Sequence, residues 1–215
     1  MTAETIEHLC QVEVAIEKAK SLLTKLKFPD DLRTVIVAAT IDQLIEHHAA
    51  VLLLIRAERV GSAFALARSV VEGMYRGLWI NFCATDGEIQ KFSEIDRLPL
   101  NMQEMADAID DKYRGEGFFD DLKKRTWAAL CSYAHTGMLQ LGRRFTGHQL
   151  KPAYRDGEIF EITTALTTAV LTLTSKFLAV QNLVKESKAI EQLIESYGPV
   201  AKQLAHPSAG APGSG

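Results

Sequence analysis

Apolar residues recur every three or four positions through long segments without proline, a periodicity typical of amphipathic α-helices. Residues 2–26, for example, carry one apolar stripe made of Leu9, Val12, Ile16, Ala19 and Leu23. Alanine, leucine, glutamate, lysine and glutamine, which favour helices, are frequent in these segments. No run of alternating strands and hairpin turns stands out. The pattern therefore predicts an all-α fold.

The breaks between the helical segments contain proline, glycine or residues suited to helix caps. Phe28-Pro29 ends the first segment, and Asp30 or Asp31 is placed to cap the second. We predict a single-domain bundle of about five long helices plus two short ones over residues 1–205. The helical segments are expected at about 2–26, 31–59, 62–84, 87–94, 101–113, 118–144, 157–182 and 185–205. The segment 118–144 leaves a bend at Gly137 or Gly142 open, and the Gly/Pro/Ser-rich tail 206–215 predicts disorder.

The composition excludes several classes of protein. The chain has 215 residues, of which 47% are hydrophobic, and a net charge of -3, so the domain as a whole is not a cationic nucleic-acid binder. The longest fully apolar run, Ala49 to Ile55, is far shorter than the ~20 residues that cross a bilayer. The first residues lack the pattern of a signal peptide. We expect a soluble cytoplasmic protein without contact to a membrane.

The three cysteines, Cys10, Cys83 and Cys131, are too widely spaced for a disulfide framework or a zinc site. We expect all three to be buried, reduced thiols. A Cys131–His135 catalytic pair is the alternative, but nothing around Cys131 predicts an activated thiolate. No metal-binding motif, phosphate-binding loop or dinucleotide fingerprint is present, so we expect no metal and no cofactor.

Polar residues interrupt the apolar stripes of two helical segments. His48 lies within the stripe of the second segment, where it is either a hydrogen-bonded core imidazole or a ligand-binding group. Arg68, Glu72 and Arg76 follow one another at i, i+4 and i+8 in the third segment. Such a row is either an ion-pair ladder at the surface or an inward-facing set in which two guanidinium groups hold an anion.

A third candidate set lies in the segment 118–144. If that helix is unbroken, Arg125, Ser132, His135 and Arg143 fall within a sector of roughly 100°. Arginine can hold a phosphate in a bidentate fork, and histidine can serve as a general acid or base near neutral pH. This face therefore predicts a catalytic site for phosphate chemistry, with a packed, structural His135 as the alternative.

Two stretches, ALARSVVEGMYRGLW and WAALCSYAHTGMLQLGRR, carry a resemblance to a known family. They resemble a family of small uncharacterised bacterial all-helical proteins, in which an Arg-x-x-x-Glu helix is followed by Ser-Tyr-x-His-x-Gly. That family is distantly similar to the HEPN superfamily, many of whose members are dimeric, metal-independent ribonucleases of toxin and antiviral systems. The HEPN hallmark is Arg, four to six residues, then His. Here nine residues separate Arg125 from His135, and the four between Arg143 and His148 include Gly147.

Three functions follow as hypotheses. The first is a non-enzymatic interaction or regulatory module, working as a homodimer or with another protein in a toxin–antitoxin or phage-defence setting. The second is a HEPN-like ribonuclease or toxin that acts on RNA or a nucleotide through His135 and a nearby arginine. The third is a small-ligand binder that uses the polar row of residues 68–76.

Overall fold

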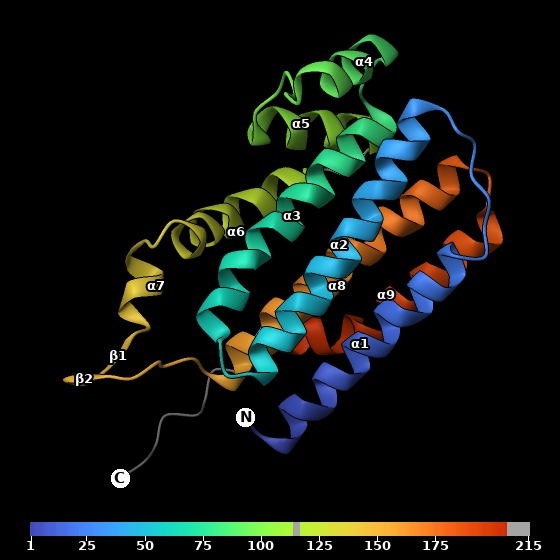
Figure 1. Cartoon of the computed structure of the whole chain (residues 1–215). Helices are drawn as coiled ribbons and strands as arrows, with labels where there is room; N and C mark the ends of the chain where they lie inside the picture. Colours follow the sequence, from blue (N-terminus) through green and yellow to red (C-terminus); the bar gives the residue numbers. More distant parts are fainter. Residues whose placement is uncertain (114–116, 206–215) are drawn as a thin grey trace.

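The computed structural model describes residues 1–113 and 117–205, and in this part of the chain the all-α prediction is confirmed (Figure 1). The predicted disordered tail, 206–215, lies outside the described residues. The elements are α1 (Ala3–Leu23), α2 (Leu32–Arg56), α3 (Val60–Phe82), α4 (Asp86–Ile95), α5 (Met102–Tyr113), α6 (Phe118–Ala134), α7 (Met138–Gly142), β1 (Phe145–Thr146), β2 (Gln149–Leu150), α8 (Asp156–Val180) and α9 (Val184–Ala205).

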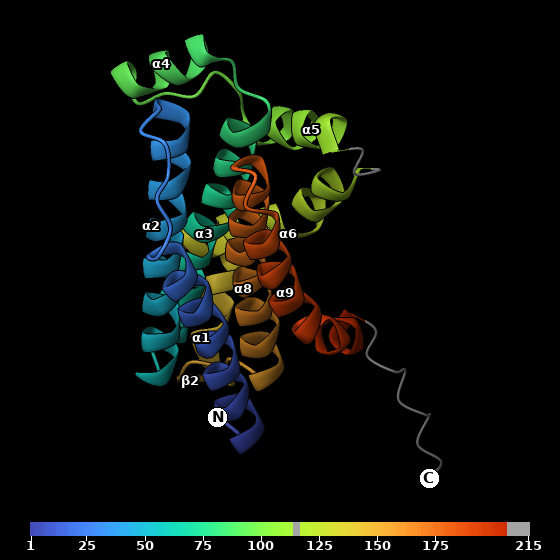
Figure 2. The ribbon, with the colours of Figure 1, turned by 90° about the vertical axis from the view of Figure 1, so that its right-hand side faces the viewer.

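Helices α3 and α8 lie at the centre of the bundle. Helix α3 packs against α2, α8, α5 and α6, whereas α8 packs against α1, α2, α3 and α9. Helices α4 and α5 cross one end of the bundle, and α6 leads along its side to α7 and the two short strands (Figures 1 and 2). The core is formed by leucine, isoleucine, valine, alanine and aromatic side chains from these helices.

Two glycines allow α3 to approach its neighbours closely. A Cβ atom on Gly73 would lie 2.5 Å from Cδ2 of Leu44 on α2, and one on Gly77 would lie 2.5 Å from Cδ2 of Leu173 on α8. Such distances are shorter than any real contact of a Cβ atom, so larger residues would push the helices apart. The spacing of the two glycines, one helical turn, therefore places α3 tightly between α2 and α8.

Side-chain caps are present at two helix starts, and one of them is the cap predicted for the second helical segment. The side chain of Asp31 accepts a hydrogen bond from the backbone N–H of Thr34 at 3.0 Å, so Asp31 rather than Asp30 caps α2. Thr85 and Glu88 form a reciprocal capping box at α4. These bonds satisfy backbone N–H groups that a helix leaves without an internal partner.

The segment 118–144, in which the sequence leaves a bend at Gly137 or Gly142 open, forms two helices with a break next to Gly137. Helix α6 ends at Ala134, and α7 begins only at Met138. Thr136 adopts a left-handed conformation with φ of 56°, which reverses the local path. Ser132 then supports the break: its carbonyl accepts from the N–H of Gly137 at 2.7 Å, and its hydroxyl accepts from the N–H of Leu139 at 3.1 Å.

Two further differences concern strands and cysteines. The chain forms a small antiparallel pair, in which Phe145 faces Leu150, and Gly147 takes the positive φ of 59° that the turn requires. Cys10 is exposed, so the prediction of a buried thiol is wrong there; it lies on the outer side of the amphipathic α1. Cys83 and Cys131 are half-buried free thiols.

By length and composition α2 and α8 could each cross a membrane, since both contain an 18-residue window with a mean hydropathy of 1.3. Both also supply much of the core, and 67% of the window in α8 is buried inside the bundle. The core helix of a soluble protein has the same composition, and the fold is consistent with one.

Candidate functional site

The polar row of α3 forms an ion-pair ladder at the edge of the bundle. Nη2 of Arg76 lies 2.5 Å from one carboxylate oxygen of Glu72, and Nε of Arg68 lies 3.5 Å from the other. The side chains of Arg68 and Glu72 are each 23% exposed, and that of Arg76 is 47% exposed. The row is thus partly buried and remains accessible from solvent.

His135, 67 residues further along the chain, contacts this row. Nη1 of Arg68 donates a hydrogen bond to Nε2 of His135, which follows the last residue of α6. The guanidinium of Arg68 also lies over the ring of Trp127, 5.0 Å from its centroid. We call Arg68, Glu72, Arg76, Trp127 and His135 the polar cluster. With two guanidinium groups and one carboxylate it has a net positive charge, which suits an anion.

The other members of the predicted phosphate site are engaged elsewhere. Arg125 is 74% exposed and pairs with Asp121 at 2.6 Å, one turn earlier on α6. Arg143 pairs with Glu158 on α8, and the hydroxyl of Ser132 caps α7. Because α6 ends at Ala134, Arg143 does not share a helix face with His135, whereas Arg125 and Ser132 remain on α6. The structure instead supplies Arg68 as the partner of His135.

His48 lies in the core, with 1% of its surface exposed. Its Nε2 lies 2.9 Å from the hydroxyl of Thr167 on α8, and that hydroxyl donates to the carbonyl of Thr163. The imidazole therefore donates to Thr167 through Nε2–H. Burial lowers the pKa of His48 to about 4, so the ring is neutral at pH 7.

His8 on α1 has a similar place beside α8. Its Nε2 lies 3.0 Å from the hydroxyl of Thr163, and its ring stacks on Phe160. Burial lowers the pKa of His8 to about 4 as well. Both histidines thus have the structural role of hydrogen-bonded core groups, and neither contributes a titrating group near neutral pH.

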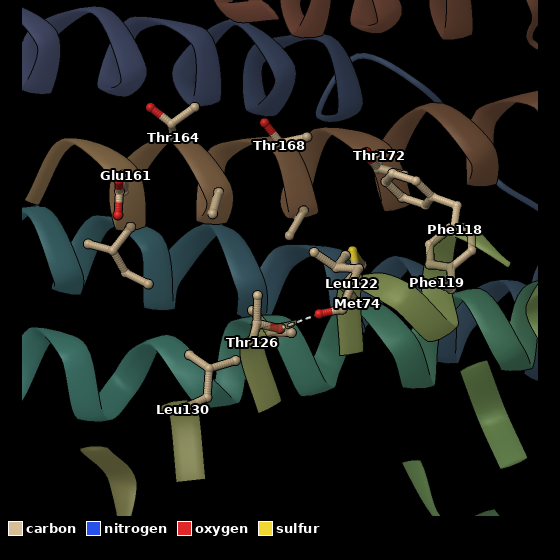
Figure 3. A pocket seen from close by; sticks show the side chains of 14 residues that line it. Met74, Phe118, Phe119, Leu122, Thr126, Leu130, Glu161, Thr164, Thr168 and Thr172 are labelled. Carbon is tan, nitrogen blue, oxygen red and sulfur yellow. Dashed lines mark hydrogen bonds between the residues drawn. The ribbon is translucent and has the colours of Figure 1, made fainter. Parts of the chain in front are cut away.

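An apolar groove of about 340 Å³ opens between α6 and α8, and the sequence analysis did not identify it (Figure 3). Helix α3 forms its floor through Val71 and Met74, while α6 and α8 form its walls. Glu161 is the one charged residue among those that line it. We call this the groove; its lining residues are Val71, Met74, Phe118, Phe119, Leu122, Thr126, Leu130, Glu161, Ile162, Thr164, Ala165, Thr168, Ala169 and Thr172.

The segment 138–150, which comprises α7 and both strands, exposes large apolar side chains. We call it the arm. Its exposed apolar residues and exposed fractions are Met138 (78%), Leu139 (50%), Leu141 (45%), Phe145 (54%) and Leu150 (78%). In the sequence these residues fit no single helical stripe, and that irregularity was the available signal for an uncovered surface.

The described residues offer no site for a metal ion: within 1–113 and 117–205, no group of three or more His, Cys, Asp or Glu side chains gathers closely enough.

Comparison with known proteins identifies a family. No curated protein and no solved structure matches the chain. Residues 41–199, which span most of α2 and everything from α3 into α9, match a family model. The match includes the polar cluster, the groove and the arm. The chain belongs to DUF6988, a family of unknown function.

Proposed function

We propose that this protein is a non-enzymatic interaction module that works as a homodimer in the bacterial cytoplasm. The observation that carries the proposal is the arm, which places five large apolar side chains in solvent within thirteen residues. Exposed large apolar side chains that gather in one segment favour a surface that binds a partner.

The arm is held in place rather than loosely attached. The side-chain amide of Gln140 donates to the carbonyl of Gly61 at 3.1 Å, and Arg143 pairs with Glu158. At its base the ring of Tyr154 packs edge-on against Phe64, with 5.4 Å between centroids. A rigid surface loses little conformational entropy when it binds, which favours association.

The biological setting of this proposal comes from the resemblance to HEPN bundles. Members of that superfamily occur in toxin–antitoxin and phage-defence systems, and we propose a regulatory role of that kind. The bacterial origin and the cytoplasmic location belong to the same proposal.

The experiment is a measurement of molar mass by light scattering on the wild type and on Leu150→Asp. We expect the wild type at twice the chain mass of 23.8 kDa and Leu150→Asp at the mass of one chain. The matched control is Leu53→Asp, since Leu53 is also exposed but lies on α2. A monomeric wild type, or equal loss of the dimer in both variants, would contradict the proposal.

A HEPN-like ribonuclease is the second candidate, favoured by the contact between Arg68 and His135. Once released from the N–H of Arg68, Nε2 of His135 would take the proton of a ribose 2′-hydroxyl, whose oxygen then bonds to the neighbouring phosphorus while the P–O5′ bond breaks. The imidazolium would return the proton to the departing O5′. Arg68 and Arg76 would stabilise the charge on the phosphorane, and Glu72 would orient both guanidinium groups.

Expression in a bacterial host tests this second candidate. The comparison is between the wild type, His135→Ala and the control His47→Ala, whose half-buried histidine lies on α2. A ribonuclease predicts growth arrest and RNA cleavage with the wild type and with His47→Ala, and neither with His135→Ala. If all three folded proteins leave growth and RNA unchanged, the ribonuclease candidate is rejected.

A further inference from the structure

We propose that the groove of one chain is filled by the arm of a second copy, and the reverse, so that two arms are exchanged across a twofold axis. This inference rests on the proposed homodimer and names the surface that forms it. The groove and the arm are both apolar, and the described part of the chain leaves both without a cover.

The shape of the groove suits the insertion of an apolar segment from outside. Helix α3 packs against both α6 and α8, whereas α6 and α8 leave the groove open between them. On the α8 side the wall includes the small residues Ala165 and Ala169, together with Thr168, which is labelled in Figure 3. Small side chains there let an incoming chain approach closely. An apolar segment laid between two helices over a third completes a helical core.

The volume of the groove fits the side chains that the arm offers. Truncation of one buried leucine to alanine leaves a cavity of roughly 150 Å³ in other proteins. A groove of about 340 Å³ thus accepts two side chains of that size. Met138 and Leu150, the two most exposed apolar residues of the arm, are of the right size and chemistry.

Charge also favours this pairing. Residues 138–151 contain Arg143, Arg144 and Lys151 but no aspartate or glutamate. The only charged residue that lines the groove is the exposed Glu161, which is acidic. Arg143 is already paired with Glu158. Arg144 and Lys151 remain to complement the single carboxylate of Glu161, and opposite charges across an interface also fix its register.

The occupant must come from a second copy because the arm is anchored away from its own groove. Gln140 bonds to Gly61 at the start of α3, and Ala153 N–H donates to the carbonyl of Arg143 at 2.8 Å. These contacts hold α7 and the hairpin out from the end of the bundle (Figure 1). Reciprocal insertion of two identical arms gives a closed, isologous dimer.

The test combines a groove variant with a crosslink. Ala165 is exposed and lines the groove, so Ala165→Glu adds a charge there without disturbing the core. We expect Ala165→Glu to be monomeric by light scattering, with the same thermal unfolding as the monomeric Leu150→Asp. The control is Leu53→Glu, on the exposed face of α2, which should remain dimeric.

For the crosslink, a chain with Ala165→Cys is mixed with a chain that carries Leu150→Cys or Met138→Cys, and a short bismaleimide is added. Peptide mass mapping then separates the new bridges from those of Cys10, Cys83 and Cys131. We expect bridges between the groove and the arm, and none when Leu53→Cys replaces the arm cysteine.

The outcomes distinguish this inference from the proposed function. A dimer that survives Ala165→Glu and gives no groove–arm bridge overturns the arm exchange but leaves the homodimer in place. A groove that takes up a hydrophobic small molecule without any change in the dimer also overturns it. A wild-type protein that is monomeric at every concentration overturns both.

Discussion

The two sides of α8 differ in how completely the chain covers its own side chains. Where α1 and α2 pack on α8, even the polar His8 and His48 are buried and hydrogen-bonded to threonines. Where α6, α7 and the hairpin lie, large apolar side chains stand in solvent beside an apolar groove. The layer between α1, α2 and α8 is a closed core, although Val14, Val35 and Leu53 stand exposed on the outer faces of α1 and α2. The second side has the features of an interface, because its exposed apolar residues accompany an open apolar groove.

Unpartnered polar atoms follow the same division. Across residues 1–113 and 117–205, the buried side-chain polar atoms without a hydrogen-bond partner are Nε of Arg68 and the hydroxyl of Tyr154. Arg68 lies in the polar cluster, and Tyr154 lies at the base of the arm. A buried polar group without a partner costs free energy, so natural proteins retain few of them. Nε of Arg68 still faces the carboxylate of Glu72 at 3.5 Å, so of these two atoms it is the hydroxyl of Tyr154, at the base of the arm, that has neither a hydrogen bond nor an ion pair.

The largest expected effect on the free energy of unfolding comes from truncating one phenylalanine on each side of α8 to alanine. Phe177 on α8 is fully buried, so Phe177→Ala should lower the free energy of unfolding by about 3–5 kcal/mol. Phe145 on the arm is 54% exposed, so Phe145→Ala should change it by less than about 0.5 kcal/mol in the monomer. Urea denaturation at low protein concentration measures both. Equal losses would remove the distinction between the two sides.

The second largest expected effect is a pH dependence of stability, which comes from the two histidines buried between α1, α2 and α8. The neutral imidazoles of His8 and His48 have pKa values of about 4 in the folded protein, against an ordinary value of about 6.5. Between these values the unfolded chain binds more protons, so stability is complete above pH 6.5 and falls as the pH is lowered towards 4. At pH 5 the loss is about 2 kcal/mol for each histidine.

Urea midpoints at pH 7 and pH 5 measure this loss. His48→Gln should reduce the difference between the two midpoints, whereas His148→Gln, on the exposed turn of the arm, should leave it unchanged. A midpoint difference that stays the same in His48→Gln would show that His48 does not titrate as its burial requires.

The smallest expected change in stability comes from the break that separates α6 from α7. Thr136 is β-branched and holds φ at 56°, a conformation that costs such a residue of order 1 kcal/mol or more. Thr136→Gly should therefore stabilise the protein by about 1 kcal/mol without changing the arm. Thermal unfolding followed by circular dichroism checks the sign. A lower melting temperature would mean that the threonine side chain makes contacts that outweigh its backbone strain.

The sequence predicts the helices, the polar row of α3 and the ambiguous position of His48 because these depend on local periodicity. It leaves a bend at Gly137 or Gly142 open but does not place the end of α6 at Ala134, since Ser132 satisfies the backbone of residues 137 and 139 in competition with the helix. The partner of His135 was missed for a different reason. Arg68 meets it only through the packing of α3 against α6, and no pattern within either helix encodes that contact.

The groove and the arm are also products of tertiary structure. The periodicity of α6 and α8 indicates that both have apolar faces, but their separation over α3 is a property of the assembled bundle. The exposure of Met138 and Leu150 depends likewise on the anchors at the base of the arm. Residue patterns thus indicate which side chains need to be buried, and the packed structure shows which of them still are not.

Hydrogen exchange as a function of protein concentration tests the central claim most directly. The account predicts that, as the concentration rises, exchange slows in the arm and along the facing sides of α6 and α8, while α1 and α2 keep the same rates. Exchange that is independent of concentration in the arm and the groove, or that slows equally in all helices, would contradict the claim that one side of this bundle is complete and the other is an interface.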